Sequence, residues 1–153
     1  MSYAELCVTS NFTFLTGASH PEELIIRAAK LDLTAIAITD RNSLAGVVRA
    51  YSALKELARV ADETGDETPR PKLIVGCRLV LRDSGVDWIA LPQDRPAYAR
   101  LTRLLTLGKQ RAGKGECHLD LADVLAGCSG IILIALPQGD ISAPDVARHI
   151  QAA

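Results

Sequence analysis

Residues 35–46 have the sequence AIAITDRNSLAG and decide the fold of this chain. The run Ala35–Thr39 is short, continuous and apolar, which is typical of a strand buried on both faces of a parallel sheet covered by helices. A helix capped by Asn42 or Ser43 should follow and end near Ala61, because its apolar residues recur at three- and four-residue steps. These are Leu44, Val47, Val48, Tyr51, Leu54, Leu57 and Ala58.

Strands and helices are expected to alternate on both sides of this stretch. Ser19 is the expected N-cap of a helix that continues to about Lys30, with Glu22 completing a capping box and Pro21 in the first turn. The other expected strands are 4–9, 73–81, 86–91 and 130–135, the other helices are 96–107, 119–126 and 144–153, and 62–71 and 109–116 are loops. This order predicts an α/β fold with a mainly parallel sheet and right-handed crossovers.

The composition is that of one globular domain. The chain has 153 residues, of which 48% are hydrophobic, so a single domain over residues 1–153 can bury a core. Seventeen basic and eighteen acidic residues give a net charge of −1, and no block of Lys or Arg provides the charge of a duplex-binding protein. We therefore expect any contact with DNA to be made mainly by other segments.

The cysteines and the hydropathy indicate a cytoplasmic protein. The four cysteines form no Cys-x-x-Cys pair, and nothing in the sequence suggests a secretory context in which disulfides would form. The longest apolar run, Ile131–Leu136, is far shorter than the ~20 residues of a membrane helix.

Two segments resemble the N-terminal PHP (polymerase and histidinol phosphatase) domain of bacterial C-family DNA polymerase alpha subunits, most closely the error-prone branch. They are residues 16–24, TGASHPEEL, and residues 40–46, DRNSLAG. The match extends from Tyr3 to Leu136, nearly the whole chain. It implies a distorted βα (TIM-like) barrel, of which this chain would be roughly the first half, with strands flanked by helices.

The resemblance also implies a metal site whose ligands are missing. Metal-binding members of the superfamily have His-x-His after the first strand, an Asp before a Gly, a His after Thr-Asp and a Glu after Gly-Cys. Here those places hold Cys7, Thr9, Thr16, Arg41 and Arg78. Superposing the family pattern on residues 86–91 places Asp87 at a further His position.

Of the replacement residues only Cys7, as a thiolate, could ligate a metal, and one ligand does not hold an ion. Threonine hydroxyls bind zinc or manganese weakly, and an arginine guanidinium has no lone pair to donate. One fixed positive charge about 4 Å from the site costs a divalent ion about 8 kcal/mol at an effective dielectric near 20. We therefore expect no metal and no other cofactor in this chain. The intact polymerase that the resemblance implies would use Mg²⁺.

Two interpretations of the arginines stay open. In the first, Arg41 and Arg78 are bridged by Asp40, Asp87 or Glu5 and form a charge-paired brace in the space that metal ions fill in relatives. In the second, both arginines extend to solvent at the starts of loops, where arginine usually lies.

Other candidate site residues have simpler explanations. The loop residues Lys109, Arg111 and Lys114 would contact phosphate or an acidic neighbouring domain, although a small basic cluster is more often a solvated loop. His20 is interpreted as a solvated residue at a helix start, and His149 as exposed. The pair Cys117-His118 resembles half of a zinc motif, but Cys128 has the wrong spacing to complete it.

The resemblance implies a role within a damage-tolerant polymerase active in DNA repair. The domain itself would be non-catalytic and would contact the polymerase palm or thumb and accessory proteins. One alternative is a metal-dependent phosphoesterase or 3′–5′ exonuclease that uses an unrecognised ligand set. The other is a pure interaction module for replication or repair proteins.

Overall fold

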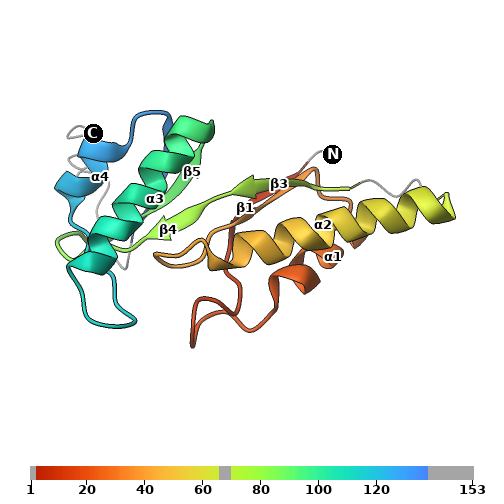
Figure 1. The fold of residues 1–153 in the computed structure, drawn as a ribbon, viewed down its shortest axis with the longest axis horizontal. Helices are drawn as coiled ribbons and strands as arrows, with labels where there is room; N and C mark the ends of the chain where they lie inside the picture. The colour runs from red at the N-terminus through yellow and green to blue at the C-terminus, as the bar shows by residue number, and fades with distance from the viewer. Residues whose placement is uncertain (1–2, 66–69, 138–153) are drawn as a thin grey trace. The chain divides into compact units, whose positions relative to one another are not determined.

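The computed structural model describes residues 3–65 and 70–137, which form two compact units. Unit 1 comprises residues 1–77 and unit 2 residues 78–153, and each is described by itself. The α/β fold class is confirmed (Figure 1). The expectation of a single domain over residues 1–153 stays a prediction, and the expected helix 144–153 lies outside the described residues. None of the described helices is long and apolar enough to cross a membrane.

Unit 1 contains a three-stranded parallel sheet. Its strands are β1 (Ala4–Val8), β2 (Ala35–Ile38) and β3 (Lys72–Val75), in the order β1-β2-β3. All four residues of β2 are buried, as the apolar run in the sequence predicts. β2 pairs in parallel with both neighbours, so strands occupy both of its edges.

Two helices pack against this sheet. Helix α1 (Pro21–Lys30) buries Ile25 and Ala28, and α2 (Ala45–Thr64) buries Gly46 and Ala50. With Ile36 and Ile38 of β2, three of these residues, Ile25, Ala28 and Ala50, form the hydrophobic core of the unit.

The ends of both helices differ from the sequence expectation. The N-cap of α1 is His20, whose N–H donates to the Glu23 carboxylate at 2.8 Å, so the capping box lies one residue beyond Ser19 and Glu22. Leu44 is the N-cap of α2, although the Ser43 hydroxyl accepts from the Ala45 N–H at 3.1 Å. The helix continues to Thr64 and is capped by Gly65 at φ 69°, the left-handed conformation that glycine adopts readily.

The buried face of α2 was only partly predicted. Leu54 and Leu57 pack against the core as expected, but Val48 and Tyr51 are 70% and 54% exposed. The small residues Gly46 and Ala50 lie against the sheet in their place. The prediction was wrong because it ranked residues by hydrophobicity, whereas close approach of a helix to a sheet selects for small side chains.

Unit 2 contains a second sheet, in the order β4-β5-β6. Its strands are β4 (Cys77–Leu79), β5 (Val86–Pro92) and β6 (Ile131–Pro137), and its helices are α3 (Arg95–Gln110) and α4 (Leu121–Gly127). The expected strand 73–81 is thus two strands, β3 and β4, interrupted at Gly76. β6 pairs antiparallel with β5, which the apolar sequence did not reveal because buried runs look alike in either direction.

Gly46 tests the close approach of α2. A Cβ at this position would lie 2.6 Å from Oδ2 of Asp40, so Gly46→Ala should lower the free energy of unfolding by about 1–3 kcal/mol. In an unobstructed helix the same change stabilises by about 0.5–1 kcal/mol, so the sign of the effect is decisive. Urea unfolding followed by circular dichroism measures it. Gly127→Ala in α4, with no atom within 4 Å of the added Cβ, is the matched control and should cause no comparable loss.

Candidate functional site

Asp40, at the C-terminal end of β2, is 1% exposed and is the most completely buried carboxylate among the described residues. The segment after β1 supplies its hydrogen-bond donors. Ser10 donates its N–H to Oδ1 and its hydroxyl to Oδ2, each at 2.8 Å, and the Thr13 hydroxyl donates to Oδ1 at 2.8 Å. Because a buried carboxylate is costly unless it is hydrogen-bonded, these donors make Asp40 acceptable in this position.

The Asp40 cluster joins several segments of unit 1. The Thr13 hydroxyl also accepts a hydrogen bond from the Arg41 N–H at 3.0 Å, so Thr13 connects the segment after β1 with the segment after β2. The Cys77 thiol, just beyond β3, donates to the Asp40 carbonyl at 3.4 Å. The chain beyond all three parallel strands therefore meets at one residue.

The predicted ligand positions of unit 1 differ in their exposure to solvent. Cys7 and Thr16 are exposed and Thr9 is half-buried. The Arg41 side chain is exposed and makes no ion pair within the described part of the chain, as the interpretation of a solvent-facing arginine expects. In this unit the residues that gather are hydroxyls around one carboxylate, which is a structural arrangement.

In unit 2, Arg78 of β4 and Asp87 of β5 form an ion pair. Arg78 Nη2 and Nε lie 2.6 and 2.8 Å from Oδ2 of Asp87. The Asp87 side chain is 8% exposed and that of Arg78 27%, so the contact is partly shielded from water. Asp40 and Arg41 belong to unit 1, and the four-residue brace stays a prediction.

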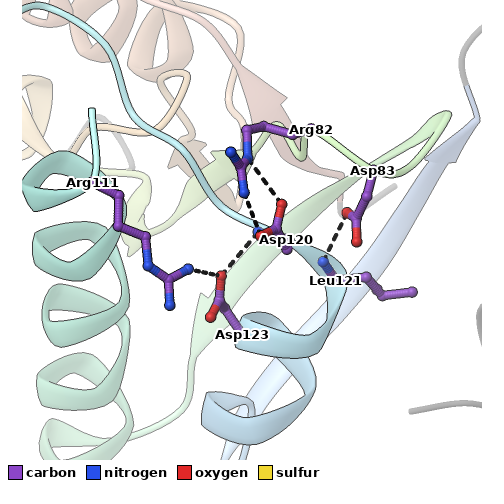
Figure 2. Close-up of polar contacts among 6 residues, drawn as sticks. All are labelled: Arg82, Asp83, Arg111, Asp120, Leu121 and Asp123. Atoms are coloured by element: carbon purple, nitrogen blue, oxygen red, sulfur yellow. Dashed lines mark hydrogen bonds and ion pairs between the residues drawn. The ribbon is translucent and has the colours of Figure 1, made fainter. Parts of the chain in front are cut away.

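A second polar network connects the turn before β5 with the start of α4 (Figure 2). Arg82 binds the Asp120 carboxylate through two nitrogens at 3.0 and 2.6 Å, and Arg111 binds Asp123 at 2.6 Å. The Asp83 carboxylate accepts from the N–H of Leu121 at 2.9 Å. The sequence left Arg111 as either a phosphate or partner contact or part of a solvated loop; in the structure its guanidinium binds an internal carboxylate. Contacts by Lys109 and Lys114, both exposed, stay a prediction.

These arginines shift the pKa values of the carboxylates. The hydrogen bond from Arg82 lowers the pKa of Asp120 below its ordinary value of 3.8. Burial acts to raise the pKa of Asp123, but hydrogen bonds from Arg111 and from the Asp120 N–H outweigh it, and the net shift is downward. Both carboxylates therefore stabilise the folded unit in their charged forms.

The donor set does not fit a metal centre. Across residues 3–65 and 70–137, no three His, Cys, Asp or Glu side chains gather where they could hold an ion. His118 lies 3.3 Å from Glu116, and Cys117 has a pKa raised by burial, which disfavours the thiolate that a metal requires. The ring of His20 contacts the Asn11 amide at 2.9 Å, and His149 lies outside the described residues.

The model of the PHP domain family matches residues 5–152. This chain belongs to the PHP domain family. An error-prone DNA polymerase of Ruegeria pomeroyi is 68% identical to it over 91% of the chain, and one of Rhodopseudomonas palustris is 47% identical over 98%. This chain matches only 15% and 13% of the lengths of these two relatives.

Solved structures share the fold at low sequence identity. A Bifidobacterium adolescentis protein, classed provisionally as a metal-dependent phosphoesterase, has a TM-score of 0.68 at 15% identity and matches 99% of the PHP domain and 75% of that chain. An amidohydrolase from Chromobacterium violaceum, with bound sulfate and no metal, has a TM-score of 0.61 at 18% identity over 98% of the domain and 72% of that chain. At these identities the likeness supports the PHP-like fold alone.

Sequence reasoning missed the role of Ser10 and Thr13. Both lie in an uncharged segment that was considered mainly for the ligand position at Thr16. A signal was present, because an Asp directly after a fully apolar strand needs donors from a neighbouring strand end. Which segment supplies them depends on the pairing of β1 with β2.

Removing the Asp40 carboxylate should destabilise the PHP domain. Asp40→Ala leaves the buried Ser10 and Thr13 hydroxyls without their acceptor, so we expect a loss of about 3 kcal/mol in the free energy of unfolding. Urea unfolding measures the loss. The control is Asp62→Ala, an exposed residue 3.8 Å from Arg70, which should stay within about 0.5 kcal/mol of wild type. Equal effects for the two variants would contradict a structural role for Asp40.

The lowered pKa values predict acid sensitivity in unit 2. A carboxylate whose pKa is depressed by folding contributes stability that is present above its unfolded pKa and lost as the pH falls through its folded pKa. The gap in urea midpoint between wild type and Asp120→Asn should therefore be constant above about pH 5 and narrow below pH 3.8. In an Arg82→Met background, which lacks the donor to Asp120, Asp120→Asn should produce a gap in urea midpoint that changes less with pH. A gap that widens on acidification would refute this account.

Proposed function

We propose that this PHP domain is part of an error-prone DNA polymerase and serves there as a structural module that binds no metal and hydrolyses no phosphoester. The parent protein would carry out DNA-directed DNA synthesis across damaged template in repair, with Mg²⁺ at its polymerase site. The domain would stabilise that protein without contributing a catalytic group.

The sequence relatives support the polymerase part of this proposal. The 68% identity to the Ruegeria pomeroyi protein covers nearly the whole domain, and further relatives from Rhodopseudomonas and Brucella carry the same description. Because the domain spans at most 15% of the first of these proteins, most of the chemistry would belong to segments outside it.

The ion pair of Arg78 and Asp87 carries the metal-free part of the proposal. The Arg78 guanidinium pairs with the Asp87 carboxylate, which would otherwise be free to bind a cation. The guanidinium keeps its positive charge near neutral pH. Thr9, Thr16 and Arg41 provide no strong donor at the other expected positions. The hydrolytic alternative would need ligands that the described residues do not bring together.

The same proposal names partners and location. The domain would contact the palm or thumb of the polymerase and accessory replication or repair proteins, while other domains would hold most of the DNA. The net charge is −1, and Arg82 and Arg111 are already paired with carboxylates. Both observations support the view that the domain contributes little to phosphate binding. The four cysteines, none of them in a disulfide, fit the reducing cytoplasm.

Metal analysis tests the central part of the proposal. After incubation with Mn²⁺ and Zn²⁺ and removal of unbound ions, the purified domain should retain less than about one tenth of an ion per chain by mass spectrometry. It should also hydrolyse bis(p-nitrophenyl) phosphate no faster than buffer, because no activated water is available.

The opposite result would favour the phosphoesterase alternative. That result is one tightly held ion per chain together with turnover that Cys7→Ala abolishes. Cys128→Ala is the matched control, because this half-buried cysteine lies outside the predicted ligand set and its loss should leave such turnover unchanged.

A further inference from the structure

The loop between β1 and α1 presents an apolar tip to solvent. We define the apolar tip as Phe12, Phe14 and Leu15, whose exposed fractions are 39%, 84% and 91%. Figure 1 shows this segment as a red loop that leaves β1 and extends away from the strands before it returns to α1. Phe14 and Leu15 are adjacent and strongly exposed, and contiguous exposed apolar side chains of this kind mark interaction sites.

The backbone that carries the tip is held in place by hydrogen bonds. The N–H groups of Thr13 and Gly17 donate to the carbonyls of Ser10 and Thr13, both at 3.0 Å, and the Asn11 N–H donates to the Ser19 carbonyl at 2.9 Å. The buried Thr13 hydroxyl, bound to Asp40, anchors the centre of the loop. Phe14 and Leu15 are therefore displayed on a pre-organised turn, which lowers the entropy lost on binding.

Two backbone constraints turn these side chains outward. Leu15 has φ 63°, in the left-handed region that leucine rarely adopts, and such a conformation persists only where the surrounding structure imposes it. A Cβ at Gly17 would lie 2.1 Å from the Ser10 carbonyl oxygen, so only glycine permits the loop to close here. The fold maintains a strained turn whose visible result is the exposure of two apolar side chains.

The chemistry of the tip selects its occupant. Residues 6–19, LCVTSNFTFLTGAS, contain no charged side chain, so the tip offers nothing to nucleic acid phosphates or lipid headgroups. The apolar tip therefore suits an apolar pocket on the surface of a protein. The domain spans 15% of its Ruegeria pomeroyi relative, so a tethered protein surface of several times its size would be available at high effective concentration.

We propose that the apolar tip docks into an apolar pocket formed by the part of the same polypeptide that follows residue 153. This inference rests on the proposed function, which makes the domain one part of a longer polymerase. Phe14 and Leu15 insert as neighbouring anchors, and Phe12 covers the edge of the contact. The Asp40 cluster thus positions an interdomain contact as well as the loop.

Site-specific photo-crosslinking in the full-length polypeptide tests the docking. The photoreactive amino acid p-benzoylphenylalanine replaces Phe14, and crosslinked peptides are mapped by mass spectrometry. We expect crosslinks within one polypeptide to residues after 153, at a yield at least about tenfold above that of the control. The control carries the same group at Tyr51, which is 54% exposed on α2.

Every other outcome overturns the docking proposal. These outcomes are crosslinks only within residues 1–153, a crosslinked dimer of two copies, or a yield equal to that at Tyr51. Primer extension by the same preparation separates this failure from failure of the proposed function. If extension is normal and the crosslink is absent, only the docking is wrong. If the polypeptide extends no primer, the assignment to a polymerase fails first.

Discussion

The burial of the Asp40 carboxylate is the constraint on which unit 1 depends. A carboxylate at the end of a central buried strand requires donors, and the segment after β1 supplies them from Ser10 and Thr13. The same carboxylate requires space, which Gly46 leaves at the start of α2. One polar group therefore sets the path of a loop and the approach of a helix, and through the loop it sets the orientation of Phe14 and Leu15.

In unit 2, ion pairs fix the positions of neighbouring segments, as the Asp40 hydrogen bonds do in unit 1. Arg78 is engaged by Asp87, Arg82 by Asp120 and Arg111 by Asp123, so each of these arginines connects two segments. Partly exposed ion pairs add little stability individually, and their value here lies in fixing the turn before β5 and the start of α4. These charged residues therefore hold neighbouring segments of unit 2 together.

Much of this fold could be predicted from local sequence, and the errors have physical causes. The run at residues 35–38 identified β2 because a short, continuous apolar run is typical of a strand covered on both faces. The cap of α1 was misplaced from His20 to Ser19 because both residues precede an acidic residue by three positions. The break at Gly76 and the antiparallel direction of β6 depend on pairing partners, which no local pattern contains.

The candidate site likewise has features that the sequence predicted and features that required the structure. From the sequence alone it followed that Thr9, Thr16, Arg41 and Arg78 offer no strong donor group, because donor chemistry is a property of the residue type. Only the tertiary structure decided that Arg78 meets Asp87, that Arg111 faces Asp123, and that Asp40 is enclosed by two hydroxyls. Those contacts join residues 9 to 30 positions apart, and their formation depends on which strands pair and how closely the helices approach them.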